Sequence, residues 1–255
     1  MINKSMPNKR LLNIYFTAGY PELDSLHHIL PTLIEGDADY IEIGLPYSDP
    51  LADGPVIQLA GKIALENGMN IDVLFDQLST HIDLMIKKPV YLMGYFNQML
   101  QFGIERFLLA CQKVNVAGLI IPDLPMEYFE IEMKELFEKY GIKITFLVSP
   151  LTSEDRIRKA SKLSTGFVYV VTRPAITGTK AVLDENMISY LKKLAEMKLN
   201  RVLLLGFGIQ DKKSFEFATA YLDGAIVGTM FLKHLELRGT DKDQMQIFIS
   251  QFKND

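Results

Sequence analysis

The chain has 255 residues, of which 48% are hydrophobic and 23% are charged, so it can bury a sizeable core and is not dominated by disorder. A single α/β barrel typically has about 250 residues, and we expect one domain over residues 1–255. The net charge of −4 argues against a general attraction to nucleic acid or anionic lipid. These values favour a protein that binds a small molecule.

The single cysteine, Cys111, excludes an intramolecular disulfide and is compatible with a reducing cytoplasm. The longest uncharged stretch, residues 89–104, is interrupted by Gly, Asn and Gln and is shorter than the roughly 20 apolar residues of a membrane-spanning helix. No signal peptide is evident. His27 and His28 are neighbours that cannot point to one face, and the other two histidines stand apart, so we expect no metal site.

Short apolar, β-branched or aromatic runs recur along the chain, and each ends near a Gly, Pro, Asn or Thr. They are nearly continuous rather than alternating, which is typical of parallel strands covered on both faces. The predicted strands are residues 11–19, 40–46, 89–97, 118–125, 142–150, 167–172, 201–208 and 224–231.

Segments with helical periodicity alternate with these runs. The predicted helices are residues 22–34, 56–67, 71–86, 104–114, 126–140, 154–163, 185–197 and 212–221, with residues 244–252 closing the chain. Start and stop signals support several of them, namely Thr152 followed by Asp155, Pro55 at a helix start and Gly141 at a helix end.

The strict alternation predicts an α/β fold, a (β/α)8 TIM barrel with an extra helix after strand 2. A doubly wound open sheet would show the same local pattern, but the number of units and the length favour the barrel. Reactive groups in such barrels project from the carboxyl ends of the strands and from the loops that follow. Those positions are therefore where we expect the chemistry of this chain.

Glu42 lies within an apolar run at residues 40–44. A carboxylate there is unfavourable unless it has a partner or a task, and burial should raise its pKa toward the range useful for proton transfer at neutral pH. With a period of two residues, Glu42 shares a face with Gly44, which we expect to leave open space beside it. A structural ion pair with a basic residue on a neighbouring strand is the alternative.

The loop at residues 46–55 carries Asp49 and Asp53 and three prolines that stiffen it. A rigid loop suits a side chain that must be aimed at a substrate. Each aspartate also has a structural interpretation, Asp49 as a turn residue before Pro50 and Asp53 as a capping neighbour of the helix that Pro55 begins.

Glycine-containing loops follow the sixth, seventh and eighth predicted strands, at residues 177–178, 206–208 and 228–229. Glycine lets backbone N–H groups approach an anion, and barrels often bind phosphate after strands seven and eight. The last two loops contain no Lys or Arg, so a phosphate there would depend on amide donors. Turns between strand and helix favour glycine anyway, but three such loops side by side predict a phosphate site.

The segment from Glu42 to Asp53 belongs to a longer motif, IEIGLPYSDPLADGPVIQ at residues 41–58. Shorter motifs span the rest of the chain: FTAGYP at 16–21, MGYFN at 93–97, IPDLP at 121–125, ITG at 176–178, GFGI at 206–209 and GAIVGT at 224–229. Taken together, these motifs resemble the tryptophan synthase alpha chain family. The resemblance implies a (β/α)8 lyase that splits indole-3-glycerol phosphate into indole and glyceraldehyde 3-phosphate during tryptophan biosynthesis.

The resemblance also implies roles for individual residues. Glu42 corresponds to the catalytic acid/base, and Asp53 to the carboxylate that holds the indole N–H. The cleavage needs a proton at indole C3, stabilisation of positive charge on the ring nitrogen and removal of a hydroxyl proton, which two carboxyls in different environments can supply. The implied substrate-binding residues are Tyr15, Tyr95, Tyr169, Thr177, Gly178, Phe207, Gly208, Gly228 and Thr229.

Within that set, Gly178, Gly208, Gly228 and Thr229 correspond to phosphate-binding positions. Tyr15, Tyr95 and Phe207 correspond to the apolar wall around the indole, whereas Tyr169 and Thr177 organise the site and its closing loop. We expect that loop, residues 172–183, to cover the bound substrate. Pro174 and Ala175 depart from the small residue and glycine that are common in the family, and Thr229 replaces a serine while keeping the hydroxyl.

The family usually works with a beta chain that receives indole through a tunnel and carries pyridoxal phosphate. The resemblance therefore implies a heterotetramer of two alpha and two beta chains and no cofactor on this chain. Two alternatives stay open. A phosphosugar isomerase or epimerase would share the phosphate loops but has no need of the segment from Glu42 to Asp53, and a non-catalytic subunit that activates a beta chain would not need both carboxyls.

Overall fold

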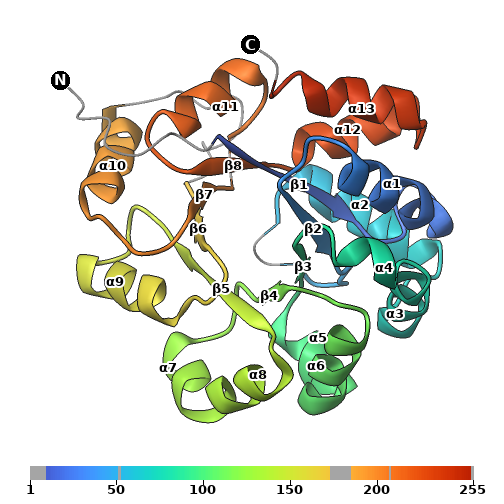
Figure 1. Cartoon of the computed structure of the whole chain (residues 1–255), viewed down its shortest axis with the longest axis horizontal. Helices are drawn as coiled ribbons and strands as arrows, with labels where there is room; N and C mark the ends of the chain where they lie inside the picture. The colour runs from blue at the N-terminus through green and yellow to red at the C-terminus, as the bar shows by residue number, and fades with distance from the viewer. Residues whose placement is uncertain (1–9, 51–52, 173–184, 207, 254–255) are drawn as a thin grey trace.

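A closed barrel of eight parallel strands forms the centre of the computed structural model, which describes residues 10–50, 53–172, 185–206 and 208–253 (Figure 1). The strands are β1 (Leu11–Thr17), β2 (Tyr40–Gly44), β3 (Val90–Met93), β4 (Gly118–Ile120), β5 (Lys143–Val148), β6 (Val168–Val170), β7 (Leu203–Leu205) and β8 (Gly224–Val227). They follow one another in chain order, and β8 pairs with β1. The predicted barrel is confirmed, and the open-sheet alternative is wrong because no edge strand is left.

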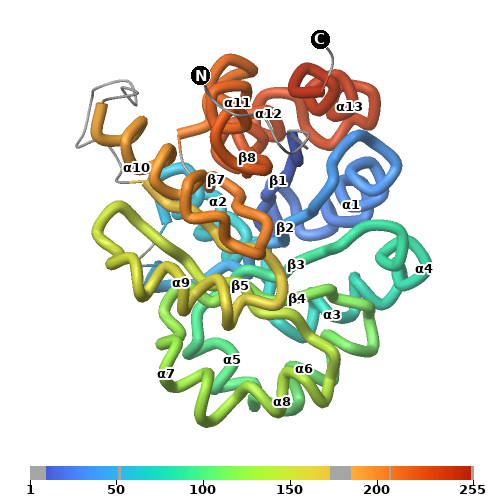
Figure 2. The backbone as a smooth tube through the Cα atoms, turned by 60° about the vertical axis from the view of Figure 1, so that its left-hand side comes forward, coloured from blue at the N-terminus to red at the C-terminus, as the bar shows by residue number. Residues whose placement is uncertain are grey.

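The helices surround this barrel (Figures 1 and 2). They are η1 (Leu23–Ser25), α1 (Leu26–Glu35), α2 (Pro55–Glu66), α3 (Ile71–Ser79), α4 (Ile82–Met85), α5 (Phe96–Phe102), α6 (Ile104–Lys113), α7 (Met126–Tyr128), η2 (Phe129–Met133), α8 (Lys134–Tyr140), α9 (Glu154–Leu163), α10 (Glu185–Glu196), α11 (Lys212–Thr219), α12 (Thr229–Arg238) and α13 (Lys242–Ser250). Both views place α13 beside α1, where Lys242 Nζ lies 2.8 Å from Glu35 Oε2. The last helix thus closes the ring against the first.

The extra helix predicted after strand 2 is confirmed, because α2 and α3 both lie between β2 and β3. The second of the two predicted helices, residues 71–86, is divided into α3 and α4. The predicted helix at residues 126–140 contains a π-helical stretch, η2. Pro55 and Gly141 act as predicted, since Pro55 is the first residue of α2 and Gly141 ends α8 with φ of 67°.

Two helices were not predicted. Residues 89–97 were assigned to one strand, but β3 ends at Met93 and α5 follows; likewise, residues 224–231 include both β8 and the start of α12. At the start of α5 the Gln98 side chain accepts the N–H of Tyr95 at 3.0 Å, and the N–H of Phe96 donates to Asp123 Oδ1, 27 residues later, at 2.8 Å. No described side chain caps α12. The cap of α9 was also misplaced by one residue: Ser153, not Thr152, accepts the N–H of Arg156.

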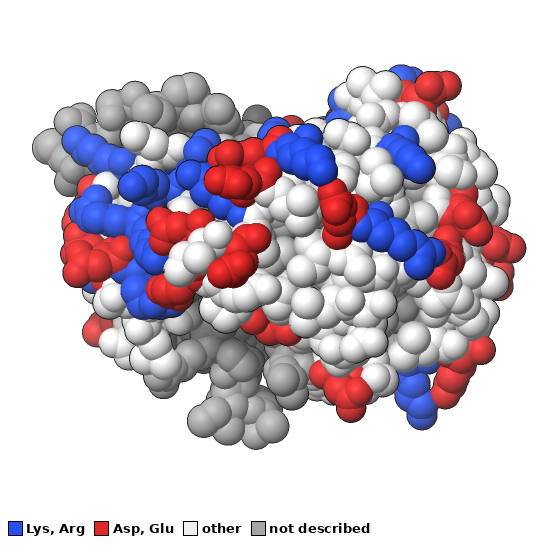
Figure 3. Space-filling view, turned by 90° about the horizontal axis from the view of Figure 1, so that it is seen from below, with Lys and Arg blue, Asp and Glu red and all other residues white. Residues whose placement is uncertain are grey.

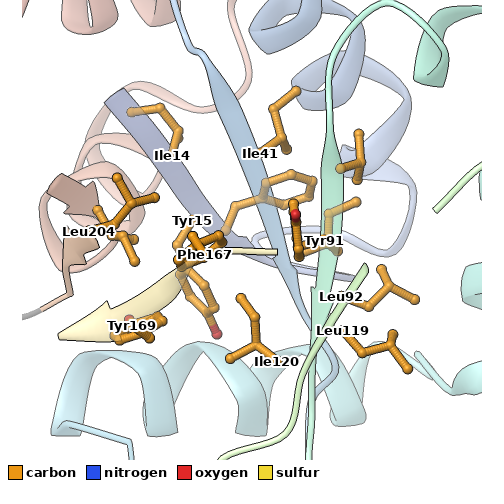
Figure 4. Close-up of a cluster of buried hydrophobic side chains, with 14 of the residues drawn as sticks. Ile14, Tyr15, Ile41, Tyr91, Leu92, Leu119, Ile120, Phe167, Tyr169 and Leu204 are labelled. Carbon is orange, nitrogen blue, oxygen red and sulfur yellow. The ribbon is translucent and has the colours of Figure 1, made fainter. Parts of the chain in front are cut away.

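Aromatic rings fill the barrel interior below its mouth. Figure 4 shows Tyr91 and Phe167 in this interior, and their ring centroids lie 5.2 Å apart. The centroid of the Tyr91 ring lies 6.1 Å from that of Tyr40. Glycines on neighbouring segments make room for these rings: a Cβ at Gly118 would lie 2.5 Å from Tyr91 Cε1, and one at Gly166 would lie 2.8 Å from Tyr91 Oη. This packed layer forms a floor on which the residues nearer the mouth rest.

The exterior carries charges of both signs. Figure 3 shows Lys and Arg interspersed with Asp and Glu over the face that it displays. Arg156 Nη1 lies 2.9 Å from Glu127 Oε1, and Lys159 Nζ lies 2.8 Å from Glu130 Oε2, with all four side chains substantially exposed. Exposed pairs of this kind contribute little to stability. Within the described ranges, no helix has the length and apolar character required to cross a membrane.

We predict that barrel closure is sensitive to a single methyl group at Gly224. A Cβ there would lie 2.1 Å from the backbone oxygen of Leu11, so Gly224→Ala should destabilise the fold by about 1–3 kcal/mol through overpacking. The matched control is Gly61→Ala in α2, whose Cβ would meet only Pro46 at 4.0 Å; this substitution should stabilise by up to about 1 kcal/mol. Urea unfolding measures both, and a similar free energy of unfolding for the two variants would contradict the prediction.

Candidate active site

Glu42 lies in the middle of β2 with its side chain inside the barrel and no exposed surface. Asn13 of β1 donates a hydrogen bond from Nδ2 to Glu42 Oε2 at 3.0 Å. The partner that the described residues give this carboxyl is therefore an amide rather than a basic side chain. This arrangement does not support the alternative of a structural ion pair.

Burial raises the pKa of Glu42 to about 8. The hydrogen bond from Asn13 opposes this shift, and the nearby charge of Asp53 adds to it. A carboxyl with such a pKa is largely protonated at neutral pH, so it can donate a proton and take one back within one catalytic cycle.

The space beside Gly44 is occupied, not open as predicted. A Cβ at Gly44 would lie 2.1 Å from Tyr15 Oη, so the glycine accommodates the end of that tyrosine. A second tyrosine has the same arrangement, since a Cβ at Gly206 would lie 1.8 Å from Tyr169 Cε1. Figure 4 shows Tyr15 and Tyr169 inside the barrel. The glycines thus shape the pocket indirectly, by admitting two aromatic rings.

Both tyrosines remain neutral near physiological pH. Burial is the largest cause that raises the pKa of Tyr15 and of Tyr169, and the charges of Asp53 and Glu42 raise both further. The Tyr15 and Thr17 hydroxyls lie 3.3 Å apart. Each ring therefore offers an apolar face together with a protonated hydroxyl beside the two carboxyls.

Asp53 occupies the loop after β2 and is partly buried. Tyr95 Oη donates to Asp53 Oδ2 at 3.2 Å, and Gln58 Nε2 donates to the Asp53 backbone oxygen at 2.9 Å. Burial raises the pKa of Asp53, while the hydrogen bond from Tyr95 lowers it. The N-cap residue of α2 is Gly54, and no described side chain caps this helix, so the Asp53 carboxylate does not serve as the cap.

Asp49 has a different environment. Its side chain is exposed, and its Oδ2 accepts a hydrogen bond from Ser48 Oγ at 2.5 Å. This local contact fits the structural interpretation of Asp49 as a turn residue.

The last of the predicted phosphate loops forms the start of α12. Gly228 is the N-cap residue and Thr229 the first residue of this helix, and no side chain caps it within the described ranges. Unpaired N–H groups at a helix N-terminus bind anions well. Gly208 has φ of 84°, a conformation that suits glycine. Thr177, Gly178 and Phe207 lie outside the described residues, as do Pro174 and Ala175.

The sequence did not predict two side-chain contacts. The first is the bond from Asn13 to Glu42; the only signal for it was a polar residue in an apolar run, two positions before Tyr15. The second joins His27 Nδ1 to His81 Nε2 at 2.9 Å, although His81 was expected to stand apart. Across the part of the chain that is described, no three His, Cys, Asp or Glu side chains gather to hold a metal ion.

The family model for the tryptophan synthase alpha chain matches residues 1–254. The chain belongs to the tryptophan synthase alpha chain family. It is 43% identical over 250 residues to the tryptophan synthase alpha chain of Flavobacterium johnsoniae, with 98% of both chains covered. It is 45% identical over 236 residues to that of Flavobacterium psychrophilum, with 92% of this chain and 93% of the relative covered.

A solved structure extends the similarity to three dimensions. The crystal structure of the tryptophan synthase complex from Pyrococcus furiosus matches with a TM-score of 0.84 and 27% identity, covering 96% of this chain and 98% of that chain. As a member of the tryptophan synthase alpha chain family, this chain is a carbon–carbon lyase of tryptophan biosynthesis that acts on indole-3-glycerol phosphate. Family membership favours this activity over a phosphosugar isomerase or epimerase.

The raised pKa of Glu42 predicts a specific pH dependence of stability. A carboxyl whose folded-state pKa is raised contributes stability that is complete below its unfolded pKa and is lost as pH rises from about 4.5 to about 8. Glu42→Gln removes this loss, so its free energy of unfolding should increase relative to the parent across that interval. Urea titrations at several pH values test this, and a constant difference between the two proteins would exclude a raised pKa.

Proposed function

We propose that Glu42 and Asp53 are the catalytic carboxyls with which this alpha chain cleaves indole-3-glycerol phosphate. The observation that carries the proposal is their difference in environment. Glu42 has no exposed surface and a pKa near 8, whereas Asp53 lies in the loop above it with a hydrogen bond from Tyr95. Two carboxyls in environments that differ in this way can serve as acid and as anionic stabiliser.

In the proposed reaction, protonated Glu42 donates its proton to indole C3. The Asp53 carboxylate accepts the indole N–H and stabilises the positive charge that develops on the ring nitrogen. The Glu42 carboxylate then removes the proton of the side-chain hydroxyl adjacent to the ring. The bond between C3 and that carbon breaks, its electrons return to the ring, and the hydroxyl carbon becomes the aldehyde, so Glu42 regains its proton.

The proposed substrate pocket lies between three tyrosines and the phosphate loops. Tyr15, Tyr95 and Tyr169 supply aromatic walls, and Phe207 is assigned to the same wall. For the phosphate we propose backbone N–H groups of Gly208, Gly228 and Thr229, with Gly178 as a further donor and Thr177 in the closing loop. The N-terminus of α12, which no described side chain caps, supports this placement.

The proposed partner is a tryptophan synthase beta chain that carries pyridoxal phosphate, in a heterotetramer of two chains of each kind. The crystal structure from Pyrococcus furiosus that this fold matches is described as a tryptophan synthase complex. We also propose that the enzyme works in the cytoplasm. The one cysteine, Cys111, is a free thiol that is buried, and burial raises its pKa. A chain with a single free thiol and no disulfide suits a reducing compartment.

Glu42→Gln should abolish nearly all indole formation, because the amide keeps the shape of the side chain but cannot exchange a proton. The expected loss is at least about 10²- to 10⁴-fold in kcat, the usual contribution of a positioned acid/base. Asp53→Asn should also be severely impaired, since the anion beside the ring nitrogen becomes neutral. Asp49→Asn is the matched control in the same loop and should retain activity close to that of the parent.

These rates are measured as indole release, with and without a beta chain. Binding of glycerol 3-phosphate checks that the variants keep their fold and phosphate site. Turnover of Glu42→Gln within about tenfold of the parent would remove Glu42 from the catalytic role. Normal activity of Asp53→Asn would show that Asp53 has only a structural role.

The phosphate site predicts opposite effects for two substitutions of Thr229. Thr229→Asp puts a negative charge at the first position of α12, where it would repel the phosphate and accept the same N–H groups, so the affinity for glycerol 3-phosphate should fall at least about tenfold. Thr229→Ser keeps the hydroxyl and the amide and should bind like the parent. Calorimetry measures both, and unchanged binding by Thr229→Asp would place the phosphate elsewhere.

A further inference from the structure

We propose that Asn13 is a positioning residue for Glu42: its amide holds one carboxyl oxygen and leaves the other free for proton transfer. This inference rests on the proposed catalytic role of Glu42. It adds a residue that lies in β1, away from the loops that carry the rest of the proposed site.

The register of the barrel fixes the direction from which Asn13 reaches Glu42. β1 and β2 are parallel, and Tyr15 is opposite Glu42 while Asn13 is opposite Tyr40. Asn13 and Tyr15 share the inward face because strand side chains alternate. Asn13 therefore lies nearer the amino ends of the strands than Glu42 does, and its amide approaches the carboxyl from the side away from the mouth.

The two carboxyl oxygens of Glu42 differ in their hydrogen bonding. Oε2 accepts the bond from Asn13 Nδ2 at 3.0 Å, whereas Oε1 has no hydrogen-bond partner among the described residues. A carboxyl held through one oxygen has a fixed orientation, and its second oxygen can still exchange a proton. Positioning of this kind is what efficient acid/base catalysis requires.

The orientation of the Asn13 amide depends on Glu42 alone. Neither group has exposed surface, and Asn13 Oδ1 has no partner in the described part of the chain. A reversed amide would direct Oδ1 at Glu42 Oε2, and two acceptors would face each other whenever Glu42 is ionised. An apolar residue of similar size would remove the unpaired Asn13 oxygen but would also leave Glu42 Oε2 without this donor, so the amide at position 13 serves the carboxyl.

The same bond opposes the effect of burial on Glu42. An N–H donor stabilises the carboxylate more than the neutral acid, so Asn13 lowers the pKa of Glu42 while burial raises it. The other titratable groups near Glu42 are Asp53, Tyr15, Tyr169 and, opposite it on β3, Tyr91. Burial raises the pKa values of the three tyrosines, so they stay neutral. The Asp53 side chain is still present in an Asn13 variant.

The test is the pH profile of kcat for indole release by Asn13→Leu, an apolar side chain of similar shape. Glu42 must be protonated to begin the reaction, so activity falls at high pH as it ionises. Without the Asn13 donor, the pH at which kcat falls on the alkaline side should rise by about one unit. This shift corresponds to about 1.4 kcal/mol, the scale of a charge-assisted hydrogen bond. Loss of orientation should also lower the maximal kcat about tenfold with little change in KM.

A second measurement reports on Glu42 without catalysis. Infrared spectroscopy of the free protein detects the carbonyl stretch of protonated Glu42, assigned by its disappearance in Glu42→Gln, and its titration should show the same upward shift in Asn13→Leu. Asn13→Asp keeps the shape of the side chain and places a second carboxyl against Glu42, so it should move the titration further upward. This variant serves as well if Asn13→Leu does not fold.

The control is Thr145→Val, another buried polar residue of the barrel, whose Oγ1 accepts from the N–H of Phe167 at 3.4 Å. It should lower stability without moving the pH limb. An unshifted limb and infrared titration in the Asn13 variants, with Glu42→Gln inactive, would overturn the inference and leave the proposed function intact. An active Glu42→Gln would overturn the proposed function itself.

Discussion

Burial of a carboxyl group inside a closed apolar barrel is the constraint on which the rest of this site depends. An ionised Glu42 would be a charge without contact with water, and among the described residues only Asn13 donates a hydrogen bond to it. Ionisation at this position is therefore unfavourable. The proton consequently stays on the carboxyl near neutral pH. An ordinary surface glutamate would be ionised and would have no proton to give to a carbon atom.

Closure of the barrel imposes a second condition, because eight strands leave an interior that side chains must fill. Here large aromatic rings help to fill it, and two of them lie against a glycine on another segment: Tyr91 against Gly118, and Tyr169 against Gly206. Any larger residue at those glycines would displace a ring. Glu42 itself lies in β2 within this packed interior, so the reacting carboxyl does not depend on a loop for its placement.

The sequence allowed the barrel, the order of its strands and the burial of Glu42 to be predicted, because apolar runs of strand length report directly on parallel strands covered on both faces. It did not separate β3 from α5 or β8 from α12. In both cases the apolar run continues from a buried strand into a helix whose N-cap residue is not Ser, Thr, Asp or Asn but Tyr95 in α5 and Gly228 in α12. The acceptor for the N–H of Phe96 is the distant Asp123. Contacts between strands, such as that from Asn13 to Glu42, depend on the register, which periodicity does not determine. The space beside Gly44 was misjudged for the same reason, since Tyr15 comes from the neighbouring strand.

The two carboxyls influence each other, and each accepts a hydrogen bond from a neutral side chain that lowers its pKa. Tyr95 lowers the pKa of Asp53 and so favours its charged form; the charge of Asp53 in turn raises the pKa of Glu42. Asn13 acts in the opposite direction on Glu42 by stabilising its carboxylate. A protonated acid beside an ionised carboxylate is thus the natural state of the pair, because the charge resides where a hydroxyl and partial exposure support it and the proton resides where burial is complete. The donors Tyr95 and Asn13 come from different strands and loops, so the protonation of the pair is a property of the assembled barrel and not of the segment from Glu42 to Asp53 alone.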